Sequence, residues 1–427
     1  MTATTTVGRP VLVASVRPHL LLASAALPRT GPAEPPPQGP VEDALAHEAR
    51  LGRRPPGSAE VLAQVERAAL HGLGGAHVPT ASRWRRTLSE QGPLTVVANG
   101  AESEPVGAKD AILLRQRPHL VLDGLLLAAE TLGARRVVVW LHGDDRGAHR
   151  ALADALAERR WTQRSEPAIE LVRGPSHYLA GQSSAIARAL SGGPALPTTP
   201  RPDRADSGRT LVQNVETLAR VALLARGHAP TGTTLLTVLL PSGRHVVEVE
   251  RSTAVQDVLA DVAGGAEGPP PRAVLVGGFG GQWVAWDRIR HLPVDEPALR
   301  SEGLSLGAGI LAPLPRETCG ISETASLVSY LASMSARQCG PCTFGLPALA
   351  DHLAALAAGS SSRRALDRLL ADARAIEGRG ACHHPDGATR LVASAVATFR
   401  EEISAHVQGR ACPLQHSLAF PVPEGTP

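Results

Sequence analysis

A glycine-rich loop followed by arginines is the first place in the chain whose residue types suit a ligand. The loop reads Gly72-Leu-Gly-Gly75, and Arg83, Arg85 and Arg86 follow it closely. Glycine has no side chain, so a ligand can approach the backbone N–H groups between these positions. Backbone N–H and guanidinium groups both donate hydrogen bonds to phosphate oxygens, which makes the loop a candidate phosphate site. The alternative interpretation is a helix end followed by a surface turn, since glycine loops are common.

Thiols form a second group with chemical potential, and all of them lie late in the chain. An odd, clustered set of cysteines is a poor disulfide framework and a better candidate for a metal site. The clearest element is the Cys-Gly-Pro-Cys segment, because two thiolates in one loop can converge on a metal ion or cluster. The cysteines are Cys319, Cys339, Cys342, Cys382 and Cys412.

A helix must position the glycine loop. Ser58 is a suitable N-cap, and Val61, Leu62 and Val65 recur on one helical face. This spacing predicts a helix over Ser58–His71 that ends where the loop begins.

Composition limits the classes of function. The chain has 427 residues, a formal net charge of +3 and 3% aromatic residues, which argues against a nucleic-acid-binding protein. Its hydrophobic content of 43% is typical of a soluble globular protein large enough for two to four domains. No apolar run approaches the roughly 20 residues of a membrane span. We therefore expect a cytoplasmic protein without direct membrane insertion, with any membrane association mediated by partner proteins.

Changes in periodicity predict the domain organisation. Residues 46–230 alternate helix and strand, which indicates a parallel or mixed sheet covered by helices. One of these helices is predicted over 118–132, where apolar residues recur at helical spacing. Residues 231–313 begin with a hairpin followed by a helix and a strand, the order of a ubiquitin-like β-grasp domain. Residues 314–415 show four helical segments, the last over 387–407, and predict a four-helix bundle that carries the cysteines. In the second segment, over 345–358, four leucines share one side of the predicted helix: Leu346, Leu349, Leu353 and Leu356. Residues 1–45 form a partly ordered segment with short strands near 11–16 and 20–22 and a Pro-rich linker, and residues 416–427 form a tail.

The glycine loop resembles the flavin loop of the NADH-binding flavoprotein subunit (the F subunit) of bacterial complex I. That family usually reads Gly-Arg-Gly-Gly-Ala-Gly-Phe-Pro-Thr-Gly-x-Lys-Trp, and the segment from Gly72 to Trp84 follows this order. The residues that differ from the family pattern are Leu73, His77, Val78, Ala81 and Arg83.

Three further blocks extend the resemblance in unbroken order. Asn99–Asp110 resembles the family's acidic loop and places the only lysine, Lys109, on a motif position. Residues 178–185 resemble its second glycine block, and residues 212–217 resemble its Val-Asn-Asn-Val-Glu-Thr. With the later domains, the resemblance covers about residues 46–412. It implies a Rossmann-like flavin domain, a β-grasp (SLBB-like) domain and a helical bundle. The alternative interpretations are that residues 99–110 form an ordinary polar loop and that the glycines at 277–281 serve only to form a turn.

The resemblance also implies which residues bind FMN. Arg83, Lys109 and the glycine loop would hold the phosphate, while amides and backbone groups would orient the ring and the ribityl chain. Val78 cannot stack as the family's phenylalanine does, and Gln182-Ser183 replaces an acidic pair, so the flavin site is better preserved than the site for NAD(H). The predicted FMN residues are Gly72, Gly74, Gly75, Arg83, Asn99, Glu102, Lys109, Gly181, Gln213 and Asn214.

In this family, Cys-x-x-Cys-x-x-Cys and a fourth cysteine about forty residues later bind a 4Fe-4S cluster. Cys339, Cys342 and Cys382 match three of these positions, and Gly345 stands at the third position of the motif. Three interpretations remain open. The first is a cluster with a substitute ligand from His383, His384 or Cys412. The second is a trinuclear cluster, or a cluster with an open iron position. The third is that the cluster is absent and that a zinc ion or free thiols remain.

The sequence therefore predicts an FMN-dependent electron-transfer protein, with or without an iron–sulfur cluster, resembling a diaphorase-type NADH:acceptor oxidoreductase. Its use of NADH is open, and its partners would be ferredoxin-like or other redox subunits, including those of a membrane redox complex. The alternative is a structural or docking subunit without flavin chemistry. Bound flavin in the purified protein would distinguish the two.

Overall fold

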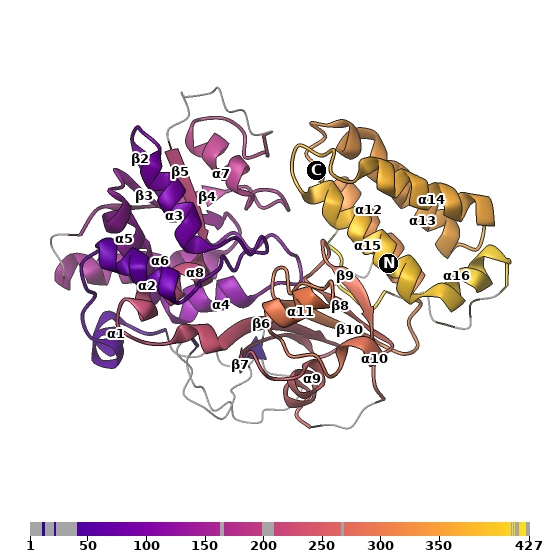
Figure 1. Ribbon diagram of the computed structural model, residues 1–427, viewed down its shortest axis with the longest axis horizontal. Coiled ribbons are helices and arrows are strands. Elements are labelled where there is room, and N and C mark those ends of the chain that lie inside the picture. Colours follow the sequence, from indigo (N-terminus) through magenta and orange to yellow (C-terminus); the bar gives the residue numbers. More distant parts are fainter. Residues whose placement is uncertain are drawn as a thin grey trace.

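The structure is a computed structural model, and it describes residues 11–12, 21–22, 41–162, 166–198, 209–265, 269–410, 412, 414 and 418–423. Figure 1 shows three regions. An α/β region built on strands β2–β5 lies on one side, helices α12–α16 lie on the other, and a second sheet lies between and below them.

The first sheet has four parallel strands in the order β4-β3-β2-β5. The chain passes from β2 to β3 to β4 in one direction and then returns to the other side of β2 to form β5. The carboxyl ends of β2 and β5 therefore flank a point where the strand order reverses, which is where ligands bind in open α/β sheets. The strands span Leu94–Asn99 (β2), Arg136–His142 (β3), Ile169–Gly174 (β4) and Arg209–Asn214 (β5).

Apolar helices cover this sheet. α5 coincides with the predicted helix 118–132, and nearly all its side chains are buried because it packs between the sheet and other helices. The helices of this region are α1 (Ala44–Leu51), α2 (Ala59–Arg67), α3 (Thr80–Ser89), α4 (Lys109–Gln116), α5 (Pro118–Leu132), α6 (Arg146–Thr162), α7 (Ser183–Leu190) and α8 (Val215–Leu224).

The prediction of a helix over Ser58–His71 was too long. α2 ends at Arg67, and Ala69 takes a left-handed backbone conformation with φ 47°. This turn lets Leu70 donate its N–H to the carbonyl of Val65. The chain thereby buries the Leu70 side chain and does not continue the helix for another turn. Ser58 stands at the N-cap position, but its side chain makes no capping hydrogen bond.

Gly124 allows α5 and α8 to approach closely. A Cβ atom at this position would overlap the carbonyl oxygen of Leu218 on α8. Because that obstacle is backbone, it cannot move without separating the helices.

We expect Gly124→Ala to destabilise the protein by about 3 kcal/mol or to prevent folding, since overpacking in a dense core costs about 1–3 kcal/mol or more. Thermal unfolding followed by circular dichroism measures the effect. Gly232→Ala is the matched control, because a Cβ atom there meets nothing within 4 Å. Equal melting temperatures for the two variants would contradict this account of the packing.

A buried ionic network ties α1 to α5. His47 contacts Glu42 through Nδ1 at 3.2 Å and Asp123 through Nε2 at 2.9 Å, and Arg159 and Arg226 also pair with Asp123. Burial alone would lower the pKa of His47, but the two carboxylates outweigh it and raise that pKa. Burial likewise opposes ionisation of Glu42, yet its partners lower its pKa to about 2.

The protonated form of His47 therefore stabilises the fold. This contribution is complete below the unfolded pKa of about 6.5 and disappears as the pH rises through the higher folded pKa. We expect His47→Asn to lower the free energy of unfolding by about 2 kcal/mol at low pH, with a smaller loss at high pH. Melting temperatures at about pH 6 and about pH 9 test this against His291→Asn on the exposed surface. A pH-independent difference would show that the charge of His47 does not contribute.

The second sheet has six strands in the order β1-β7-β6-β10-β8-β9. β6 and β7 form the predicted antiparallel hairpin, β10 runs parallel to β6, and β1 runs parallel to β7. The N-terminal strand thus belongs to this sheet, although residues 1–45 were predicted as a separate segment. Residues 13–16 and 20 of the strand predictions lie outside the described residues, and residues 21–22, which were also predicted as strand, form a bend instead. The strands are β1 (Val11–Leu12), β6 (Thr233–Leu240), β7 (Gly243–Glu250), β8 (Ala273–Val276), β9 (Gln282–Ala285) and β10 (Ile310–Leu314).

Short helices complete this region. α9 packs its apolar face against the sheet, with Val255, Val258, Leu259 and Val262 buried. The elements are η1 (Pro230–Gly232), α9 (Val255–Val262), α10 (Trp286–Ile289) and α11 (Glu296–Ser301).

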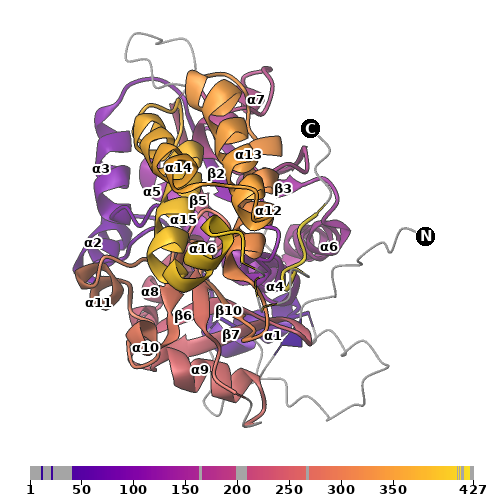
Figure 2. The same ribbon diagram turned by 90° about the vertical axis from the view of Figure 1, so that its right-hand side faces the viewer.

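The C-terminal region is helical, and Figure 2 looks onto it. The segment predicted as one helix over 387–407 is two helices, because the chain leaves helical geometry at Phe399 (φ −107°, ψ 40°). The Phe399 ring is buried against Trp283, and this anchor redirects α16. The helices are α12 (Gly320–Ser333), a short π-helix (Pro341–Gly345), α13 (Leu346–Ala357), α14 (Arg363–Ile376), α15 (His384–Thr398) and α16 (Arg400–Val407). In the described part of the chain, no helix is long and apolar enough to span a membrane.

Candidate functional site

The predicted flavin residues meet at the carboxyl ends of β2 and β5. Asn99 and Asn214 end these two strands and are direct partners in the sheet register. The Asn99 side-chain amide donates to the carbonyl of Gly181 at 2.8 Å, and its oxygen accepts the N–H of Ala101 at 3.1 Å. Residues from three separate predicted motifs therefore lie together where the strand order reverses.

The glycine loop covers this edge of the sheet. A Cβ atom at Gly74 would lie 3.2 Å from Cβ of Asn214, and Gly75 has φ 101°, which favours glycine. The N–H of Leu73 donates to Thr217 Oγ1 at 2.9 Å, which fixes the loop to the start of α8. α3 begins at Thr80, directly after the loop, and the N–H of Thr80 donates to the carbonyl of Leu70 at 2.9 Å.

One observation indicates that this edge is built to receive a polar group, and a second shows that residue 181 packs closely on the acidic loop. Gln213 is 1% exposed, and its Nε2 has no hydrogen-bond partner within the described residues. A buried amide without a partner is costly, so a ligand that accepts this N–H would be stabilised. At Gly181, a Cβ atom would lie 2.6 Å from Ser103 Oγ and 2.8 Å from the Ala101 carbonyl oxygen, so only glycine fits.

Lys109 lies beside this edge in a buried group of charges. Its Nζ donates to Asp110 at 2.8 Å and to Glu216 at 3.0 Å, and Glu216 also pairs with Arg220. Burial would lower the pKa of Lys109, but these carboxylates outweigh burial and raise it. Two of the three ammonium protons are thus already used, which leaves one for a ligand.

Glu102 is held in a neutral form next to this group. Burial and the Asp110 carboxylate raise its pKa to about 8, so it is mainly protonated at neutral pH and can donate a hydrogen bond. Arg83 is half-buried on α3 and has no ion-pair or hydrogen-bond partner for its side chain in the part of the chain that the structure describes. Arg83 is therefore the cation of the predicted set that is available to an anion.

A pocket lies beside the glycine loop and extends from Lys109 and Glu216 to residues 306–309. Stacked imidazoles of His71 and His77 stand at this loop, with ring centroids 4.3 Å apart and planes at 6°. His77 has φ 49° where the family has glycine. The sequence analysis did not predict this histidine pair. The presence of one histidine on each side of the glycine loop was the signal that could have indicated it. The pocket is lined by Gly72, Gly75, His77, Lys109, Glu216 and Glu296, among others.

The positions that differ at the predicted NAD(H) site have local roles. Gln182 is the N-cap of α7: its Oε1 accepts the N–H groups of Ser184 at 2.8 Å and Ala185 at 3.1 Å. Val78 is 40% exposed and offers no aromatic ring. The uncharged residue at 182 therefore preserves the helix end while removing a negative charge from it.

Glu104 of the acidic loop joins the two sheets. Its buried carboxylate accepts the N–H groups of Phe279 at 2.8 Å and Gly280 at 3.2 Å, and the Tyr178 hydroxyl at 2.5 Å. Gly278 has φ 92°, and a side chain there would meet this carboxylate. The glycine turn at 277–281 thus has a defined role in binding Glu104.

Cys339, Cys342 and Cys382 form one group, the Cys339–Cys382 group, between the π-helix and the start of α15. The thiols of Cys339 and Cys342 contact each other, and Cys382 is close enough to influence Cys342. Burial and the neighbouring thiols raise the pKa of Cys342 to about 12, so a metal must displace protons to bind there. Backbone N–H groups of Arg337 and His384 point at Cys342 and Cys382, as hydrogen bonds to cluster sulfurs do.

The three residues considered as substitute ligands have other partners, and Gly345 at the third motif position is closely packed. A Cβ atom at Gly345 would lie 2.7 Å from the Ile376 side chain, so a cysteine there would have to displace Ile376. His384 is buried with Nε2 bonded to the carbonyl of Leu331 at 2.8 Å, and the exposed His383 pairs with Asp386. Cys412 lies beside Cys319 and His406 instead.

Comparison with known proteins identifies the family. The family model described as the Nuo51 FMN-binding domain matches residues 65–223, and the NADH-ubiquinone oxidoreductase-F iron-sulfur binding region matches residues 322–406. The NADH-quinone oxidoreductase F subunit of Salmonella typhimurium is 30% identical over 380 residues, which are 82% of this chain and 84% of that protein. The chain belongs to the NADH-quinone oxidoreductase F family.

Other matches agree with this assignment. The NADH-quinone oxidoreductase F subunit of Streptomyces coelicolor is 28% identical over 83% of this chain and 84% of that protein. A crystal structure of a NAD+-reducing NiFe-hydrogenase in the air-oxidized state superimposes with a TM-score of 0.73 at 25% identity. That match covers 82% of this NADH-quinone oxidoreductase F family member and 63% of the hydrogenase chain. The predicted family, the mixed α/β architecture and the FMN and iron–sulfur type of electron-transfer flavoprotein are confirmed.

The residues of this family member fit an FMN group. The buried amide of Gln213 is a donor without an acceptor among the described residues, and Arg83 supplies a cation. The cysteine group fits a cluster at three positions, while the other candidate ligands have partners of their own.

Proposed function

We propose that this protein uses the edge between β2 and β5 to bind FMN and the Cys339–Cys382 group to bind an iron–sulfur cluster, and that it transfers electrons between them. The observation that carries the proposal is the buried, unpartnered amide of Gln213 at the point where the strand order reverses, among the described residues. When bound, FMN supplies the chemistry of taking up a hydride or two electrons and giving up single electrons.

The residues have separate roles in this proposal. Arg83 and the N–H groups of Gly74 and Gly75 bind the phosphate, and Lys109 donates a hydrogen bond through its remaining N–H. Gly72 shapes the loop, because its N–H already donates to the carbonyl of Val78 at 2.9 Å. Asn99, Gln213 and Asn214 orient the ring and ribityl chain, and Gly181 lets the acidic loop pack closely at this edge. Asn214 would use its second amide N–H, because its oxygen caps α8 at Glu216 and its amide already donates to Asp110 at 2.7 Å. Glu102, neutral at physiological pH, donates a hydrogen bond, because burial and Asp110 raise its pKa to about 8.

The contacts between regions support transfer toward the cysteines. Tyr178, Phe279, Tyr330 and His384 form an aromatic cluster between the acidic loop and the helices, with centroid distances of 5.3–6.1 Å. Gln338, next to Cys339, binds Arg188 and the carbonyl of Pro197 on the flavin side. The two sites are therefore joined by packed side chains.

We further propose three domains with the predicted boundaries near residues 230 and 314. The β6–β7 hairpin, α9 and the return of β10 parallel to β6 support a β-grasp arrangement, and α12–α16 support a bundle. The partner is a ferredoxin-like or other redox subunit of a larger assembly. NAD(H) is the candidate electron donor. Because Val78 replaces an aromatic residue and Gln182-Ser183 replaces an acidic pair, we expect the affinity for NAD(H) to differ from that of family members with the usual residues.

An anaerobic absorbance spectrum of the purified protein, with iron and sulfide assays, tests the proposal. Flavin bands with a sulfur-to-iron charge-transfer shoulder, followed by bleaching on addition of NADH or reduced ferredoxin, are expected. A colourless protein that takes up neither FMN nor iron after reconstitution would overturn it and favour a docking role.

A further inference from the structure

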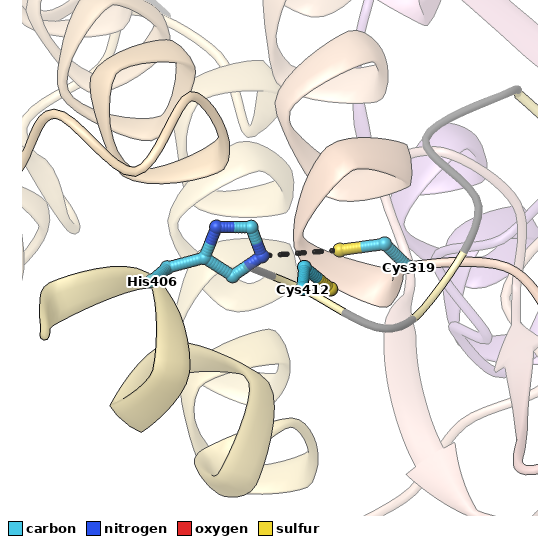
Figure 3. Close-up of side chains that lie close together, drawn as sticks. All are labelled: Cys319, His406 and Cys412. Atoms are coloured by element: carbon cyan, nitrogen blue, oxygen red, sulfur yellow. Dashed lines mark hydrogen bonds between the residues drawn. The ribbon is translucent and has the colours of Figure 1, made fainter. Parts of the chain in front are cut away.

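A second cysteine-containing group lies apart from the Cys339–Cys382 group. Cys319, His406 and Cys412 each offer one ligand atom, and these atoms all lie within 4.8 Å of one another. Figure 3 shows the three side chains pointing toward one another, with Cys319 Sγ 3.4 Å from His406 Nε2. Cys319 and Cys412 both fall outside residues 322–406, the segment matched as an iron-sulfur binding region.

Three different elements bring these residues together. Cys319 is the N-cap of α12, where its sulfur accepts the N–H of Ser322 at 3.5 Å. His406 lies in the last turn of α16 and is 2% exposed, and Cys412 follows that helix. The Arg272 guanidinium is close to both thiols. The start of α12, the end of α16 and the segment that follows α16 therefore meet at one group.

We propose that Cys319, His406 and Cys412 bind a zinc-class divalent cation. Two thiolates and an imidazole are a ligand set typical of zinc. In a tetrahedral zinc site, such ligand atoms lie about 3.5–3.8 Å apart, so the observed spacing requires only a small closure. A water completes the site, because the carboxylate of Glu402, one helical turn before His406, is already paired with Arg272 and accepts the N–H of Gly320 at 2.7 Å.

The cation would fasten the C-terminal segment to the body of the protein. Beyond Cys412, the N–H groups of Ala419 and Phe420 donate to Glu323 of α12 at 2.8 and 3.0 Å. The Phe420 ring is buried and stacks on Trp283 of β9, with ring centroids 5.8 Å apart. Metal binding at Cys412 would therefore hold this segment across α12 and the second sheet.

Zinc and iron content of the full-length protein tests the proposal. The protein is purified anaerobically from cells grown with zinc and analysed by mass spectrometry. We expect about one zinc ion per chain in the wild type, and its loss in Cys412→Ser and Cys319→Ser. Cys382→Ser is the matched control, which should keep its zinc because its thiol lies in the other group.

Cobalt identifies the ligands without interference from iron. In a Cys382→Ser background, titration with Co²⁺ should produce thiolate-to-metal charge-transfer bands, and these should disappear on adding Cys412→Ser. Cys412 lies on a terminal segment, so its substitution leaves the body of the fold intact, which circular dichroism checks. Zinc retained in Cys412→Ser, zinc lost only in Cys382→Ser, or a metal-free protein with a Cys319–Cys412 disulfide would each overturn the proposal.

Discussion

Gln213→Met is expected to lower the affinity for FMN by about 10- to 100-fold. The substitution removes the donor and leaves the acceptor atom of FMN buried without a partner, which costs about 1–3 kcal/mol. The same change should leave the melting temperature of the flavin-free protein unchanged or slightly raised. The reason is that Nε2 of Gln213 has no partner among the described residues, so methionine of similar shape removes a buried unpaired group. Fluorescence titration with FMN and thermal unfolding measure the two effects.

Gln213→Asn is the matched control, because it keeps the amide and restores the residue usual in the family. We expect it to retain much of the flavin affinity. If Gln213→Met instead destabilised the flavin-free protein strongly, the amide would have a structural role and the assignment of this edge as the flavin site would lose its main support.

The second large effect concerns iron. Cys342→Ser is expected to abolish iron and acid-labile sulfide while leaving FMN bound, because Cys342 is buried at the centre of the group with Cys339 and Cys382. Replacing a thiolate by a hydroxyl removes a soft ligand that iron–sulfur clusters require. Iron and sulfide assays and electron paramagnetic resonance of the reduced protein measure the loss.

Cys412→Ser provides the contrast, since Cys412 lies with Cys319 and His406 rather than with the three other thiols. This variant should keep its iron. Full iron content in Cys342→Ser would rule out the Cys339–Cys382 group as the cluster site, whereas loss of iron in Cys412→Ser would restore Cys412 as a substitute ligand.

Local patterns predicted much of the secondary structure. α5 matches its predicted range of 118–132, and Leu346, Leu349, Leu353 and Leu356 of α13 are all buried as their spacing indicated. Hydrophobic periodicity and helix-ending residues are local properties, so they can be read without the fold. The ordered motifs also identified the NADH-quinone oxidoreductase F family, and with it the FMN and iron–sulfur type of protein.

What the motif residues contact could not be predicted in this way. Lys109 is shared by Asp110 and Glu216, and Glu104 binds a glycine turn about 175 residues away, because strand order and docking of the second sheet bring these segments together. The group of Cys319, His406 and Cys412 has the same origin: its members are scattered along the chain and meet only when α12 and α16 pack. Local patterns were therefore sufficient for the elements and the family, whereas the pairing of distant charges and thiols follows from long-range packing, which no local pattern encodes.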